Sequence, residues 1–77
     1  MSNLRPGDLV KLKSVPTSLL DGLPEEDQAA IRSVIGQTVI FVGFSHGQAE
    51  IEFKDIHGDD HSIWVDEHRI KRARKAA

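Results

Sequence analysis

Cysteine is absent from this 77-residue chain. Its absence excludes disulfide bonds, a thiolate nucleophile and a thiolate zinc site. Because small secreted domains often depend on disulfides, we expect a reducing, cytoplasmic location. No apolar run approaches the roughly 20 residues that span a bilayer, and the N-terminus lacks the apolar segment of a signal peptide. We therefore expect no membrane partner.

Aromatic residues and catalytic motifs are also scarce. Aromatic side chains make up 5% of the chain, and none of them is a tyrosine. The sequence has no Gly-x-Ser-x-Gly elbow, no phosphate-binding loop and no dinucleotide-binding motif. Ser45 with His46, and His61 with Ser62, are sequence neighbours whose side chains we expect to diverge on a strand, so we expect neither pair to form a catalytic relay. We expect a non-enzymatic protein with no catalytic residue and no cofactor.

Charge is distributed unevenly along the chain, with half of the basic residues clustered at the C-terminal end. The formal net charge is −2, with 12 acidic and 10 basic residues. All the acids and five of the bases lie in residues 1–68, which carry a charge of −7, whereas residues 69–75 (RIKRARK) contribute five positive charges. The basic tail therefore has an acidic surface on its own molecule to meet before any outside partner is needed.

The first half of the chain predicts a strand, an irregular connection and a helix. Val10 and Leu12 alternate with lysines, which is typical of a half-buried strand. Residues 15–23 are irregular but contain three leucines, so we expect them to cover the core. Residues 24–35 begin with proline and three acids and then repeat apolar side chains at spacings of three and four, which predicts a helix. Gly36 suits the position after its C-terminus.

The second half predicts a β-hairpin followed by two more strands. Residues 37–44 are apolar on both faces, so we expect a central strand buried by the sheet on one side and the helix on the other. After the turn at 45–48, residues 48–54 alternate between apolar and polar side chains. A second turn centred on Gly58 leads to a strand at 61–66. EHR (67–69) is short enough for one 3₁₀ turn, and IKR (70–72) suits a brief last strand.

The predicted element order resembles the SH3-like small β-barrel. The resemblance lies in GDLVKL (7–12), QTVIFVGF (37–44), EIEF (50–53) and WVDEHRIK (64–71). It implies a mainly β fold, a five-stranded barrel, from which the helix at 24–35 departs, because it is inserted where a signalling SH3 domain has an extended loop. From the length and the residue pattern we expect one domain over residues 1–77, with an ordered core at 5–72 and a frayed tail at 73–77. The accessory barrels and KOW-type domains that dock onto larger machinery are similar. The aromatic groove that binds proline-rich peptides is missing, so that activity is not implied.

HGDDH, residues 57–61, is the one segment with the composition of a metal site. His57 and His61 with two aspartates could bind zinc or nickel, because imidazole and carboxylate are ligands for both metals. Gly58 breaks the helix that would bring the two rings to one face. The alternative is a polar hairpin turn, in which Asp59 or Asp60 accepts hydrogen bonds from backbone N–H groups. We favour the turn and expect no metal.

Trp64 is the leading candidate for a binding residue. Ile63 and Val65 occupy the inward face of its strand, so alternation places the indole on the other face. There it either packs under the leucine cover or is half exposed as an interface anchor, a role in which tryptophan is enriched. The sequence therefore predicts a protein-interaction or accessory module whose partner it does not identify. We expect that partner to contact Trp64, Leu19, Leu20, Glu50 and Glu52.

Nucleic-acid binding is the alternative function. Cations of the first strand and the tail could neutralise phosphates in a sequence-independent way; the candidates are Lys11, Lys13, Arg69, Lys71, Arg72, Arg74 and Lys75. The acidic body opposes this interpretation. Glu50 and Glu52 occupy a sheet face where an RNA-binding sheet would present aromatic and basic groups.

Overall fold

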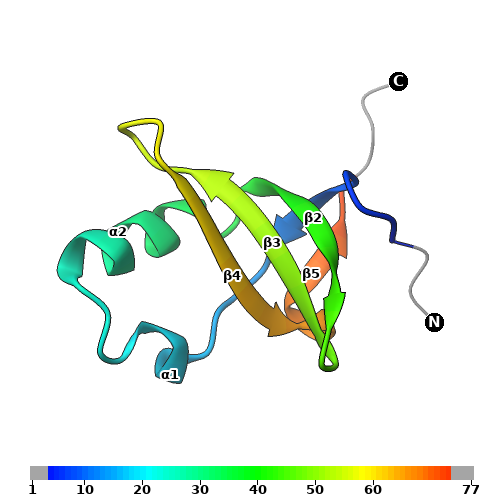
Figure 1. Cartoon of the computed structure of the whole chain (residues 1–77), viewed down its shortest axis with the longest axis horizontal. Coiled ribbons are helices and arrows are strands. Elements are labelled where there is room, and N and C mark those ends of the chain that lie inside the picture. Colours follow the sequence, from blue (N-terminus) through cyan, green and yellow to red (C-terminus); the bar gives the residue numbers. More distant parts are fainter. Residues whose placement is uncertain (1–3, 74–77) are drawn as a thin grey trace.

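The computed structural model describes residues 4–73, so residues 74–77 of the predicted frayed tail, which include Arg74 and Lys75, lie outside the described residues. Within residues 4–73, five strands and three helical segments follow one another (Figure 1). The strands are β1 (Leu9–Leu12), β2 (Thr38–Ser45), β3 (Gln48–Lys54), β4 (Asp60–Asp66) and β5 (Ile70–Arg72). The helical segments are α1 (Thr17–Leu20), α2 (Glu25–Val34) and the 3₁₀ helix η1 (Glu67–Arg69).

The strands form one antiparallel sheet in the order β4-β3-β2-β1-β5. In Figure 1, β5 appears between β3 and β2 although it follows β1 in the sheet, so the sheet is strongly curled. The predicted closed barrel is wrong, because no pairing within residues 4–73 joins β4 to β5. The three residues of η1 separate these strands and lead the chain onto β1, with which the short β5 pairs.

The predicted helix is confirmed within one residue at each end. Pro24 is the N-cap of α2, and Glu25, Glu26 and Asp27 fill its first turn, where negative charge interacts favourably with the helix dipole. Ile35 is the C-cap, and Gly36 follows it with a φ of 84°, a conformation that glycine adopts without steric strain. The four-residue α1 lies within the segment expected to be irregular.

A single core lies between one face of the curled sheet and α2. Every strand and α2 contribute to it; its members are Val10, Leu12, Ala30, Ile31, Val34, Val39, Phe41, Ala49, Ile51, Phe53, Ile63, Val65 and Ile70. Leu19, Leu20 and Leu23 pack against it and are partly buried, which confirms the predicted leucine cover. The buried alternation also confirms the predicted inward faces of β1, β3 and β4.

Strand β2 departs from its prediction, because only one of its faces is buried. Phe41 is 1% exposed, but its neighbour Ile40 is 43% exposed. The helix packs on the same face as Phe41 and leaves the face of Ile40 uncovered. A register shift between Phe41 and Gly43 then pairs Phe44 with the buried Ala49. Phe44 is still 46% exposed, and its ring meets that of Phe41 edge-on at a centroid distance of 4.9 Å. The expected burial of β2 on both faces is therefore wrong.

Candidate functional site

The outer face of β3 and β4 carries the best candidate site. Because Ala49, Ile51 and Phe53 are buried, the intervening Glu50 and Glu52 lie on the outer face. Trp64 lies on the same face of β4, between the buried Ile63 and Val65. Sequence alternation predicted this placement, and the structure confirms it.

Trp64 is 43% exposed. The sequence left two alternatives for the indole, burial under the leucine cover or half exposure, and the structure agrees with half exposure. The direct partner of Trp64 across the sheet is Glu50, while the neighbouring pair on the same face is Glu52 with Ser62. Asp66 follows two residues after Trp64 and is also exposed. Three carboxylates therefore lie on the same face of the sheet as the indole. We call Trp64, Glu50, Glu52 and Asp66 the Trp64 face.

The carboxylates of the Trp64 face form no ion pair within residues 4–73. Glu52 has a longer-range electrostatic attraction to Lys54. The cation nearest along the strand is Lys54, whose Nζ lies 2.8 Å from Oδ1 of Asp60. The hydrogen bond to Asp60 is the main reason that the pKa of Lys54 is raised above its ordinary value. Lys54 is thus already engaged at the far end of the hairpin.

Leu19 and Leu20, the other two residues expected to contact a partner, lie elsewhere. Both lie on α1, pack against the core and are partly buried, so they cover the core. Ile40 and Leu9 were missed by the sequence analysis as surface residues. They lie opposite each other on β2 and β1, and each exposes a large apolar side chain. The continuous apolar run of β2 concealed the exposure of Ile40.

The predicted basic residues gather on β1, β5 and the 3₁₀ helix between β4 and β5. Lys11 and Lys71 face each other directly in the β1–β5 pairing. Lys13 donates a hydrogen bond from Nζ to the carbonyl of His68 at 3.2 Å, and Arg69 donates to Oγ of Ser14 at 3.0 Å. Arg72 forms an ion pair with Asp8 at 3.3 Å. The structure therefore brings these five cations to one end of the sheet, away from the Trp64 face.

The turn between β3 and β4 is held together by the carboxylate of Asp55. One carboxylate oxygen accepts hydrogen bonds from the backbone N–H groups of His57 and Asp59 at 2.8 and 2.9 Å, and the other lies 2.8 Å from Nε2 of His61. These contacts, that from His61 foremost, lower the pKa of Asp55 to about 2. The expectation that Asp59 or Asp60 accepts these bonds is wrong, because Asp55 does so from the start of the turn.

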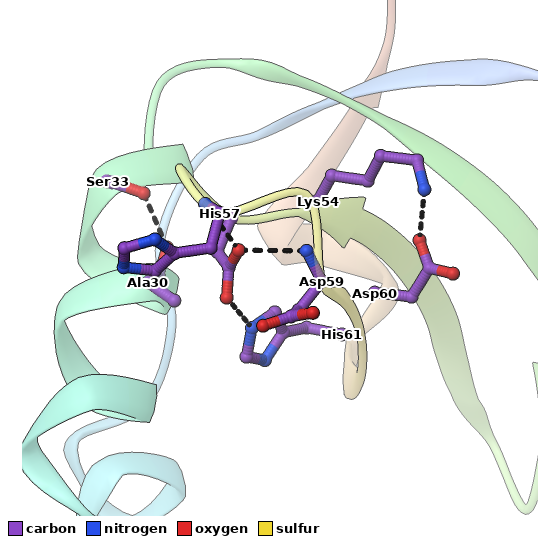
Figure 2. A network of polar contacts seen from close by, with 8 residues as sticks. Ala30, Ser33, Lys54, His57, Asp59, Asp60 and His61 are labelled. Atoms are coloured by element: carbon purple, nitrogen blue, oxygen red, sulfur yellow. Dashed lines mark hydrogen bonds and ion pairs between the residues drawn. The ribbon is translucent and has the colours of Figure 1, made fainter.

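The same geometry leaves His57 and His61 without the arrangement of a metal site. The ring of His61 stacks on Phe53 at a centroid distance of 5.3 Å, and its Nε2 lies beside the carboxylate of Asp55. The ring of His57 points away from the ring of His61 (Figure 2). No group of three or more histidine, aspartate or glutamate side chains in residues 4–73 could hold a metal ion. The segment acts in the described structure as a hydrogen-bonded turn.

The expected divergence of the Ser45 and His46 side chains is wrong. Oγ of Ser45 lies 3.1 Å from Nδ1 of His46, because His46 lies in the turn after β2, with a φ of 51°, and not on a strand.

Neither protein families nor curated proteins nor solved structures give a match to this chain. The helices within residues 4–73 are also too short or too polar for any of them to cross a membrane. The geometry of the surfaces described above is therefore the ground on which a function can be argued.

Proposed function

We propose that the protein is a non-enzymatic interaction module with an SH3-like fold, which docks a partner protein on the Trp64 face. The strand order, the curl of the sheet and the 3₁₀ helix between β4 and β5 support the SH3-like assignment. The half-exposed Trp64 supports the docking function most directly. An indole in that position keeps a large apolar area in contact with water, and burial under a partner would remove it.

A pull-down with the protein as bait tests the docking proposal. Two variants of the bait are compared, and each has lost one exposed apolar side chain. Trp64→Thr removes the proposed anchor and keeps a residue suited to a strand. Ile56→Thr is the matched control, because Ile56 is 94% exposed in the turn between β3 and β4. We expect proteins that the wild-type bait retains after nuclease treatment to be retained by Ile56→Thr and lost with Trp64→Thr. Equal retention by both variants would refute the docking role of Trp64.

Nucleic-acid binding is a second candidate, and the pairing of Lys11 with Lys71 favours it. Like charges directly opposite on neighbouring strands destabilise a sheet, and a bound phosphate would relieve their repulsion. Lys13 and Arg69 lie beside this pair, while the Trp64 face is acidic. If this candidate is right, a single-stranded oligouridylate binds with an affinity that falls steeply as salt rises, and Lys71→Glu weakens it. Loss of all partners after nuclease treatment would likewise favour it.

A further inference from the structure

The charges around Trp64 specify the chemistry of the partner more closely than the exposed indole does. Glu50 and Glu52 are two residues apart on one face of β3, so their side chains emerge about 7 Å apart. Trp64 is directly opposite Glu50, and Asp66 lies on the same face of β4 at the next step. An extended chain with cationic residues at alternate positions has the same spacing.

We propose that the Trp64 face binds an extended cationic segment of a partner protein, with an arginine stacked on the indole of Trp64. This inference rests on the docking function proposed above and names the class of partner. A guanidinium is suited to the site because it stacks on aromatic rings and donates parallel hydrogen bonds to a carboxylate. Trp64 and Glu50, side by side on neighbouring strands, supply both groups.

The negative charge of the Trp64 face favours a cationic partner over other ligands. Within residues 4–73, Glu50, Glu52 and Asp66 form no ion pair, and Lys54, which also attracts Glu52 electrostatically, is hydrogen-bonded to Asp60, so the negative charge here is compensated only in part. An anionic or a purely apolar ligand would leave three carboxylates beside it without partners, which is unfavourable. Within residues 4–73, the basic cluster that a second copy of the chain offers is formed by Lys11, Lys71 and their neighbours, on β1 and β5 at the other end of the sheet order.

The test uses a seven-residue peptide, acetyl-Gly-Thr-Arg-Thr-Arg-Thr-Gly-amide, titrated into the whole protein while the fluorescence of its only tryptophan is recorded. The control peptide has citrulline in place of both arginines, which keeps the shape and removes the charge. We expect the arginine peptide to shift the Trp64 emission and the citrulline peptide to bind at least about fivefold more weakly, as loss of charged contacts worth near 1 kcal/mol implies.

Variants of the protein locate the contact. We expect Glu50→Gln and Glu52→Gln each to weaken the arginine peptide about two- to fivefold, since exposed ion pairs contribute up to about 1 kcal/mol. Glu26→Gln makes the same change of charge in the first turn of α2 and is expected to leave the affinity unchanged. Circular dichroism of each variant shows whether it is folded, and a variant that fails to fold is replaced by the corresponding glutamate-to-serine change.

Each remaining outcome overturns the proposal. Equal binding of the arginine and citrulline peptides would exclude recognition of charge, and an unchanged affinity in both glutamate variants would place the contact elsewhere. An elution volume in gel filtration that changes with protein concentration in the wild type but not in Trp64→Thr would identify a second copy of the chain as the occupant. If partners depend on Trp64 in the bait experiment but are not displaced by the arginine peptide, the docking function stands and the inference about a cationic segment fails.

Discussion

The one-sided burial of the sheet makes a quantitative prediction about two isoleucines. Ile51 on β3 is 0% exposed, whereas Ile40 on the neighbouring β2 is 43% exposed and faces outward. Changing either residue to valine removes one methylene group and keeps the β-branched shape. The two variants therefore differ in which face of the sheet loses the methylene.

The expected costs follow from burial. Ile51→Val removes a fully buried methylene and leaves a small cavity, so we expect a loss of about 1 kcal/mol in the free energy of unfolding. Slightly more than half of the Ile40 side chain is buried, so Ile40→Val loses about that share of the transfer free energy of a methylene and leaves no closed cavity. We therefore expect its free energy of unfolding to fall by at most about 0.5 kcal/mol. In a domain of this size about 1 kcal/mol shifts the melting temperature by roughly 6 °C.

The assay is thermal unfolding followed by circular dichroism, with urea unfolding of the same samples as a second measurement. We expect Ile51→Val to melt about 6 °C below the wild type and Ile40→Val less than about 3 °C below it. Equal shifts, or a larger shift for Ile40→Val, would refute the placement of α2 and the core on a single face of the sheet.

Two further predictions concern charged residues. The pKa of Asp55, held at about 2 by His61 and by backbone N–H groups, lies below its ordinary value of 3.8, so the ionised carboxylate stabilises the fold above pH 4 and this contribution is lost as the pH falls from about 4 to about 2. Asp55→Asn should therefore be less stable than the wild type at neutral pH, with the difference in urea midpoint shrinking over that window. A difference that stays constant down to pH 2 would contradict the assignment. Lys71→Glu places an acid opposite Lys11, so we expect it to raise the free energy of unfolding by about 0.2–1 kcal/mol, with Lys71→Gln intermediate. A lower urea midpoint for Lys71→Glu than for the wild type would show that Lys11 and Lys71 do not repel each other.

Local patterns were sufficient to predict most of the secondary structure. The alternation of Gln48–Lys54 placed Glu50 and Glu52 outward, and the spacing of apolar residues after Pro24 located α2 within one residue at each end. The short α1 escaped prediction because four residues carry no detectable periodicity. Closure of the sheet depends on how β5 meets distant strands, and local patterns do not contain that information.

The candidate site was predicted in part. Alternation assigned Trp64 to the outer face, but its exposure depends on where the leucine-rich segment packs, which is a long-range property of the fold. Leu19 and Leu20 were expected both to cover the core and to contact a partner, and the structure shows the first of these contacts. The apolar run of β2 was interpreted as burial on both faces, although Ile40 is exposed.

Quenching of the single tryptophan by ions of opposite charge tests the central claim most directly, since it depends on both the exposure of Trp64 and the carboxylates around it. Caesium and iodide are compared at equal ionic strength, and each quenching constant is divided by that of N-acetyltryptophanamide. We expect both ions to quench the folded protein, with a clearly larger normalised constant for caesium, and Glu50→Gln to reduce that preference. Protection from both ions would show a buried indole, and a preference for iodide would show that its surroundings are not acidic; either result would contradict a docking face built from Trp64, Glu50, Glu52 and Asp66.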